Sequence, residues 1–248
     1  MIIVPTCDRA DGASYLEATL AAIDREIPRE DEPLRLVLKD GGRLLEGERY
    51  ELGWWQRASV AGKTRQGNLF SIHAGLQWAA TFDEPLWWFE DDIQLTPGCW
   101  EQMQFAANVG CSWWSNPKPA AFITFLDVKE HTRSGPGLHY VPPHGFDGRD
   151  CWMSQAWYLP RSTIRRLVDL SWLADWCVTP KSRRSDDDGG RRHGSDVVVS
   201  YLLGEMGAGW YVHNPSLVQH VGEVSVCQPG TRRLSHKRVS PTFSKEPR

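Results

Sequence analysis

The chain has 248 residues, 24% of them charged, and a formal net charge of −3. This length suits one α/β domain with a short tail, and the charge disfavours a surface dominated by nucleic-acid binding, without excluding a local basic patch. Six scattered cysteines without a CxxC pair disfavour a structural zinc site and a disulfide framework. No apolar run approaches the roughly 20 residues of a membrane span, and the pattern of a signal peptide is missing, so we expect a cytoplasmic protein.

Predicted strands and helices alternate along the chain. They are a strand at 2–4, a helix at 14–23, a strand at 34–39, a helix at 66–81, a strand at 86–89 and a helix from 96. Ser14 and Glu17 have the spacing of a capping box, and Thr96 before Pro97 is typical of an N-cap followed by the first helical residue. The second half has predicted strands at 120–126, 152–158 and 210–212 and predicted helices at 162–170 and from 195. This order predicts an α/β fold with a mostly parallel sheet flanked by helices.

Three acidic residues, Glu90, Asp91 and Asp92, directly follow the apolar run 86–89. Carboxylates at the end of a buried strand are costly unless a positive charge compensates them, and ligands bind at this edge of open α/β sheets. A divalent cation that bridges a carboxylate to a diphosphate would explain the pattern, and hard oxygen ligands suit Mg²⁺ or Mn²⁺. The alternative is an acidic turn that faces solvent, which the preceding apolar strand makes less favourable.

Three segments carry a family resemblance. Residues 88–97, Trp-Phe-Glu-Asp-Asp-Ile-Gln-Leu-Thr-Pro, resemble the metal-binding segment of GT-A glycosyltransferases and are most similar to that of the N-acetylglucosaminyltransferases of N-glycan branching. Residues 214–222, Asn-Pro-Ser-Leu-Val-Gln-His-Val-Gly, resemble a later segment of the same group. Residues 4–9, Val-Pro-Thr-Cys-Asp-Arg, resemble its nucleotide-binding first strand and loop. The three segments occur in the expected order.

The resemblance implies a single Rossmann-like GT-A domain at 1–227, with a nucleotide-sugar-binding half at 1–110 and an acceptor-binding half at 111–227. A basic, flexible tail is expected at 228–248. The implied activity is transfer of a sugar from a nucleotide-sugar donor, with a UDP-sugar expected, to an acceptor hydroxyl, with Mn²⁺ or Mg²⁺ as cofactor. Because the sequence shows no membrane anchor, we expect a soluble microbial or phage-like form of the family.

The same resemblance assigns roles to individual residues. Asp92 and His220 would bind the metal, while Glu90 and Asp91 would hold the donor ribose and metal-bound water. Further residues expected to contact the nucleotide-sugar are Pro5, Thr6, Arg9, Asp40, Arg65 and Asn68. For Arg65, a solvated position at a helix start explains the residue equally well.

An inverting transfer also needs a base that takes the proton of the acceptor hydroxyl. Asp196 follows Ser195 at a predicted helix start, where the helix N-terminus favours an ionised carboxylate, and the polar stretch 181–194 before it is predicted to be a mobile loop that folds over the substrate. The alternative is an ordinary acid in a first helical turn, and a retaining mechanism would remove the role. Candidates for acceptor contact are Gln155, Trp157 and Tyr158, although alternate side chains of a strand point into the core.

The acceptor itself is less defined. Basic residues gather at 181–192 and 232–238, which suits a polyanionic acceptor such as DNA with hydroxymethylated bases. A surface glycan or an anionic lipid-linked saccharide is the alternative, and the basic residues of the loop also balance the acids at 186–188. Two other functions stay open: a nucleotidyltransferase, which the single glycine in 5–12 disfavours, and an inactive sugar-binding scaffold, which the acids and His220 disfavour.

Overall fold

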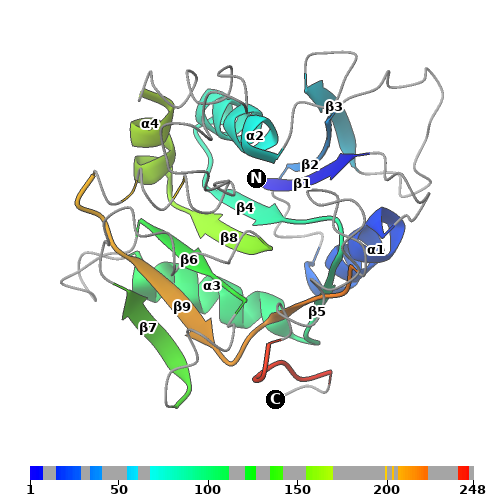
Figure 1. The fold of residues 1–248 in the computed structure, drawn as a ribbon, viewed down its shortest axis with the longest axis vertical. Coiled ribbons are helices and arrows are strands. Elements are labelled where there is room, and N and C mark those ends of the chain that lie inside the picture. Colours follow the sequence, from blue (N-terminus) through cyan, green and yellow to red (C-terminus); the bar gives the residue numbers. More distant parts are fainter. Residues whose placement is uncertain are drawn as a thin grey trace, which may run out of the picture.

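A computed structural model of the chain describes residues 1–7, 15–28, 34–40, 55–60, 68–111, 121–126, 135–141, 155–169, 199, 203, 206–222 and 240–245, with residues 40, 56–60 and 68–70 described by their backbone alone. The elements, labelled in Figure 1, are β1 (Ile2–Cys7), α1 (Leu16–Glu26), β2 (Arg35–Asp40), β3 (Gln56–Val60), α2 (Asn68–Phe82), β4 (Leu86–Phe89), β5 (Ile93–Leu95), α3 (Cys99–Gly110), β6 (Phe122–Thr124), β7 (Gly137–Val141), β8 (Ala156–Leu159), α4 (Arg161–Asp169), β9 (Trp210–Asn214) and β10 (Val218–His220).

One large sheet organises the described part of the chain. Its strand order is β3-β2-β1-β4-β8-β6-β9-β7. The strands from β1 to β4 run parallel, as do β6 and β9, whereas β8 lies antiparallel between β4 and β6, and β7 pairs antiparallel with β9. The mostly parallel sheet predicted from the sequence is therefore confirmed. Because β1, β2 and β4 are parallel, their carboxyl ends meet at one edge.

Helices cover both faces of this sheet (Figure 1). On one face, α2 and α4 share a buried cluster with the sheet that includes Ile72, Leu76, Ile164, Leu167, Ile3 and Trp88. On the other face, α1 and α3 bury Leu20, Ile23, Trp100 and Met103 against Ile2, Trp87 and Phe89. Successive residues of β4 therefore point to opposite clusters, as the pleat of a strand requires. This double burial explains why β4 reads as a continuous apolar run.

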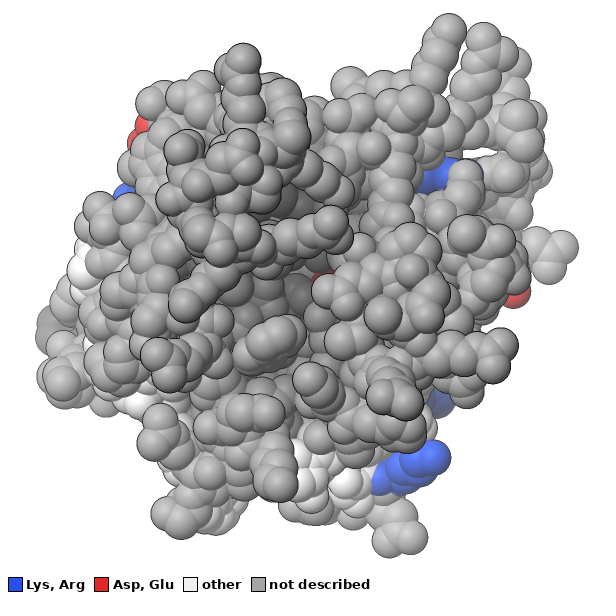
Figure 2. Space-filling view, in the orientation of Figure 1, with Lys and Arg blue, Asp and Glu red and all other residues white. Residues whose placement is uncertain are grey.

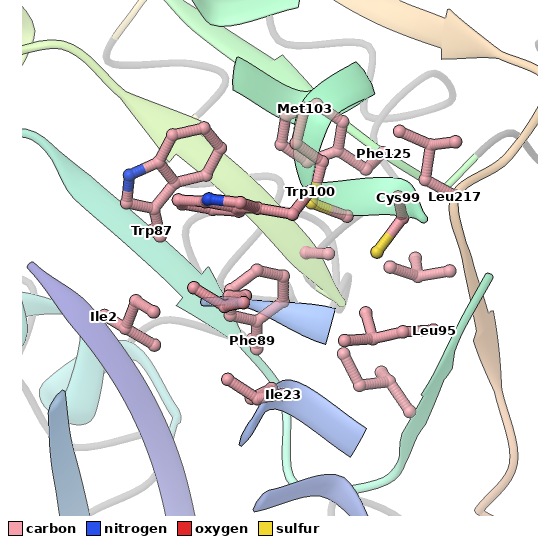
Figure 3. Packing of buried hydrophobic residues seen from close by; sticks show 14 of the residues in the cluster. Ile2, Ile23, Trp87, Phe89, Leu95, Cys99, Trp100, Met103, Phe125 and Leu217 are labelled. Carbon is pink, nitrogen blue, oxygen red and sulfur yellow. The ribbon is translucent and has the colours of Figure 1, made fainter. Parts of the chain in front are cut away.

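Figure 3 shows the buried cluster that contains Trp87 and Phe89 of β4. Trp87 lies against Trp100 of α3, with ring centroids 4.7 Å apart, and Phe89, the last residue of β4, is fully buried on the side of Ile23 in α1. Aromatic rings in such tilted contact add packing energy beyond the area that they bury. The strand that leads into Glu90 is thus anchored by large side chains up to its last residue.

Two predicted helix starts are wrong. The N-cap of α1 is Tyr15 rather than Ser14, and the side chain of Tyr15 makes no capping hydrogen bond. The N-cap of α3 is Gly98, in the left-handed region with φ 70°, so Thr96 and Pro97 lie in the turn before the helix. The turn is closed instead by the amide of Cys99, which donates to the carbonyl of Thr96. None of the described helices is long and apolar enough to cross a bilayer.

Part of the segment predicted as a flexible tail packs against the domain. The amide of Ser240 donates to Oε1 of Gln219 at 2.9 Å, and the hydroxyl of Thr242 accepts from the amide of Ser216 at 2.9 Å. Ser240 is buried, with 5% of its surface exposed. Residues 240 and 242 are therefore bonded to the domain, and the flexible tail at 228–248 stays a prediction from the sequence.

Candidate metal centre

The acidic turn lies at the carboxyl edge of β4, between β4 and β5. Its first residue is fixed by the backbone: the amide of Glu90 donates to the carbonyl of Gln155 at 2.8 Å, which extends the β4–β8 pairing by one residue. Asp91 and Asp92 are both buried, with 8% and 6% of their surfaces exposed. Buried carboxylates at a ligand-binding edge are the feature that the sequence predicted, and the alternative of a solvent-facing acidic turn is wrong for these two residues.

A short antiparallel ribbon brings His220 to the turn. β10 pairs with β5 so that His220 lies opposite Ile93, and the amide of Val221 donates to the carbonyl of Asp92 at 2.8 Å. This register places Nε2 of His220 3.1 Å from Oδ2 of Asp92. One ligand atom from each of Glu90, Asp92 and His220 lies within 4.8 Å of the others. The predicted pair of Asp92 and His220 is therefore assembled, and Glu90 joins it.

Asp91 points away from this trio. Its Oδ2 accepts a hydrogen bond of 2.7 Å from the hydroxyl of Thr6, near the end of β1. The turn that contains it is held from α1, whose Thr19 hydroxyl lies 2.9 Å from the carbonyl of Asp91 and 3.2 Å from that of Ile93. Asp91 thus joins the acidic turn to β1, the strand expected to border the nucleotide.

Gly222 completes the enclosure of Asp92. A methyl group added at Gly222 would overlap Oδ2 of Asp92 and come within 3.2 Å of its Cβ. The backbone of Gly222 is outside the left-handed region, so a lack of space, and not the torsion angle, explains the glycine. Sequence reasoning included Gly222 only as part of a matched segment, and nothing in the sequence indicated the contact with Asp92.

The donor set fits a hard divalent cation. Two carboxylates and one imidazole offer oxygen and nitrogen atoms, a combination that Mn²⁺ accepts. A divalent cation held there would also offset the mutual repulsion of neighbouring carboxylates. Cys99 and Cys111 offer no competing site, because burial raises the pKa of each thiol to about 12 and keeps it protonated.

The expected nucleotide contacts are only partly described. Pro5 is buried in β1, and Thr6 is half-buried beside Asp91. The β1–β2 register sets Asp40 opposite Cys7, at the same sheet edge as the acidic turn, and Asn68 begins α2; only the backbones of Asp40 and Asn68 are described. Arg9, Arg65 and the predicted base Asp196 lie outside the described residues, so their roles stay predictions.

The three candidates for acceptor contact, Gln155, Trp157 and Tyr158, have different surroundings in the structure. Gln155 is fully buried beside Glu90, and neither atom of its side-chain amide has a hydrogen-bond partner among the described residues. Trp157 is 2% exposed and packs on Phe122 with ring centroids 5.8 Å apart, and its contact with an acceptor stays a prediction. Of the three, Gln155 directly adjoins the acidic turn, through the bond from the amide of Glu90 to its carbonyl.

Tyr158 lies toward the other end of β4. Its ring packs against that of Trp87 with centroids 4.4 Å apart, and burial raises the pKa of Tyr158 to about 12. It lines a cavity of about 560 Å³ together with Met1, Trp100 and Asn108. Three residues of strand separate it from Gln155, roughly 10 Å, so Tyr158 lies outside the cluster around Asp92, and its contact with an acceptor stays a prediction.

Among the described residues, the charges visible on the face shown in Figure 2 do not form a basic patch. The described Lys and Arg side chains visible there are separate groups at the margin of the face. The basic segments 181–192 and 232–238 lie outside the described residues. Their proposed contact with a polyanion therefore stays a prediction from the sequence.

Comparisons with known proteins bear on the fold. No protein-family model matches the sequence, and no curated protein matches it. Among solved structures, GalNAc-T7 with UDP, GalNAc and Mn²⁺ is similar with a TM-score of 0.53 at 9% identity, over 89% of this chain and 42% of that one. An active-site mutant of LgtC is similar with a TM-score of 0.51 at 12% identity, over 93% and 92% of the two chains.

A further structure, of the galactosyltransferase LgtC with donor and acceptor sugar analogs, gives a TM-score of 0.44 at 12% identity, over 88% of this chain and 86% of that one. The chain spans less than half of the GalNAc-T7 chain that it matches, 42%. Identities this low establish architecture rather than activity. The strand order, the helices on both faces and the likeness to GalNAc-T7 and LgtC together show that this chain has the GT-A fold of glycosyltransferases.

Proposed function

We propose that the chain is a metal-dependent glycosyltransferase that moves a sugar from a nucleotide-sugar donor, expected to be a UDP-sugar, to an acceptor hydroxyl. The observation that carries the proposal is the convergence of Glu90, Asp92 and His220 at the carboxyl edge of β4. The GT-A fold supports it, as does the presence of UDP and Mn²⁺ in the GalNAc-T7 structure. The N-acetylglucosaminyltransferases of N-glycan branching remain the relatives that the sequence segments favour.

Within this proposal, Asp92, His220 and Glu90 hold the cation. A cation held there would neutralise negative charge on the donor diphosphate. The imidazole favours Mn²⁺ over Mg²⁺, because Mg²⁺ prefers oxygen ligands alone. Thr6 and Asp91 form the side of the site toward β1, where the nucleoside is expected. Gln155 is the proposed acceptor contact next to Glu90: its buried side-chain amide has no partner among the described residues, and sugar hydroxyls would supply partners once the side chain becomes accessible.

The chemistry at the acceptor is proposed from the sequence. Asp196 acts as the general base of an inverting transfer, and loss of turnover with unchanged donor binding in Asp196→Asn is the measurement for that role. The basic segments 181–192 and 232–238 favour a polyanionic acceptor such as DNA with hydroxymethylated bases. Such binding would weaken steeply with salt, because phosphate contacts release counterions, and binding that is independent of salt would contradict it.

The direct test is a panel of nucleotide-sugars and nucleoside triphosphates, assayed for thermal stabilisation with Mn²⁺, with Mg²⁺ and with EDTA. A ligand that binds only the folded state stabilises it by about 2.7 kcal/mol at a hundredfold excess over Kd. We expect one nucleotide-sugar to raise Tm in the presence of Mn²⁺ and not in EDTA. Stabilisation by triphosphates alone would favour nucleotidyl transfer, and no shift with any donor would contradict the proposal.

Gly222→Ala is expected to weaken Mn²⁺ binding by roughly 10–100-fold, the range seen when residues that orient metal ligands are changed. The added methyl group would displace the Asp92 carboxylate from its position opposite His220. The measurement is titration of Mn²⁺ followed by EPR of the free ion. Val221→Ala is the matched control. This neighbouring residue is 38% exposed, and the substitution retains the hydrogen bond from the backbone amide of residue 221 to the carbonyl of Asp92. Equal Mn²⁺ affinity of Gly222→Ala and wild type would refute the steric argument.

A further inference from the structure

The hydroxyl of Thr19 links helix α1 to the acidic turn, 72 residues later in the sequence. It is 1% exposed, lies 2.9 Å from the carbonyl of Asp91 and 3.2 Å from that of Ile93, and accepts from the amide of Ile93 at 3.3 Å. A hydroxyl has one proton and two lone pairs, so it shares its donation between the two carbonyls while it accepts from the amide. This one atom therefore contacts the backbone on both sides of Asp92.

These contacts hold the backbone from which the Asp92 side chain projects. The backbone carbonyl of Asp92 also accepts a hydrogen bond from the amide of Val221, the residue after His220. The backbone of Asp92 is thus fixed between α1 and β10, and its Oδ2 meets Nε2 of His220 at 3.1 Å. The preceding turn residue is fixed separately, through the bond from Thr6 to the Asp91 carboxylate.

The turn needs such a constraint because three successive carboxylates repel one another. Without a fixed backbone the turn would relax toward a geometry that separates them, and binding a cation would then require the turn to be ordered again. A site whose ligands are already in place avoids that cost, and such sites depend on supporting hydrogen bonds around the ligands. A threonine inside a helix more often bonds a carbonyl of its own preceding turn, whereas the hydroxyl of Thr19 is directed across to another element.

We propose that Thr19 is a positioning residue for the metal site, whose hydroxyl holds the 91–93 turn so that Asp92 and His220 converge on one cation. This inference rests on the proposed metal-dependent function. It differs from a purely structural role, which would lower the stability of the fold and leave the Mn²⁺ affinity of the folded protein unchanged.

The test compares Thr19→Val, which keeps the shape and removes the hydroxyl, with Thr19→Ser, which keeps the hydroxyl. Kd for Mn²⁺ is measured on the full chain by EPR of the free ion, and stability by urea unfolding without metal. We expect valine to raise Kd by roughly 10–100-fold and serine to leave it near the wild-type value. The matched control is Thr96→Val, since Thr96 is equally buried, lies four residues from Asp92, and its hydroxyl has no hydrogen-bond partner among the described residues.

The outcomes separate the two proposals. If wild type and Thr19→Val bind Mn²⁺ equally, the positioning role is wrong and the metal site stands. If serine weakens binding as much as valine, a retained hydroxyl does not preserve the affinity, and the specific role of the hydroxyl is again refuted. A wild-type protein that binds no Mn²⁺ overturns the metal site and this inference with it. Should valine prevent folding, Thr19→Cys replaces it: the thiol is a weak donor, and an unchanged Kd there contradicts the proposal.

Discussion

Asp92→Asn is expected to abolish Mn²⁺-dependent donor binding and to lower turnover by roughly 10³-fold, because a catalytic cation contributes several kcal/mol to stabilising a charged transition state and each 1.36 kcal/mol is tenfold. Asparagine has nearly the same shape, so the turn between β4 and β5 keeps its backbone bonds to Val221 and to Thr19. What disappears is the negative charge that faces His220 at 3.1 Å. Metal binding and turnover are therefore expected to fall together.

The fold is expected to survive this change. Removing one of three adjacent carboxylates relieves repulsion in the turn, which offsets the loss of the pair with His220. The measurements are EPR titration of Mn²⁺, turnover with the donor found in the panel, and urea unfolding in EDTA. Asp83→Asn is the control, since Asp83 is half exposed and pairs with Arg165 of α4 at 2.7 Å, away from the site. If Asp92→Asn kept wild-type Mn²⁺ affinity and turnover, the assigned metal site would be wrong.

Trp88→Ala is expected to lower the free energy of unfolding by about 3–5 kcal/mol, the usual cost of removing a fully buried aromatic side chain. Trp88 is completely buried in β4, between β1 and β8. Helix α2 packs directly on its ring: a Cβ added at Gly75 would lie 2.8 Å from the Cζ3 atom of Trp88. Because the helix has no side chain at that position with which to fill the space, an alanine at 88 leaves a cavity.

Two companion variants separate packing from other effects, with urea unfolding as the measurement. Trp88→Phe keeps most of the ring and removes an indole N–H that has no hydrogen-bond partner among the described residues, so we expect a smaller loss than with alanine. Trp78→Ala removes a half-buried ring that stacks on the exposed Phe82 at 5.8 Å, and we expect the smallest loss there. An equal loss at positions 78 and 88 would contradict the assignment of Trp88 to the core.

The sequence predicted most of the first half of the fold. The apolar run at 86–89 and the helical spacing within 66–81 correspond to β4 (Leu86–Phe89) and α2 (Asn68–Phe82). Both signals are strong because burial imposes a regular pattern on the sequence. The helix starts at Ser14 and Thr96 were wrong, because caps are local choices among several polar residues and α3 uses a left-handed glycine instead. The three-residue strands β5 and β10 were missed, since so few residues carry no periodicity.

For the candidate site, too, the sequence determined some features and missed others. The sequence alone determined that three acidic residues follow a buried strand, because residue types and their order are read directly from it. The family resemblance added His220. The sequence did not determine that Asp91 turns to Thr6, that Thr19 holds the turn, or that Gly222 leaves room for Asp92. It did not show that the indole of Trp157 is buried against Phe122. Only the tertiary structure decided these points, because they depend on the register of a short ribbon and on contacts between residues far apart in sequence, which no local pattern encodes.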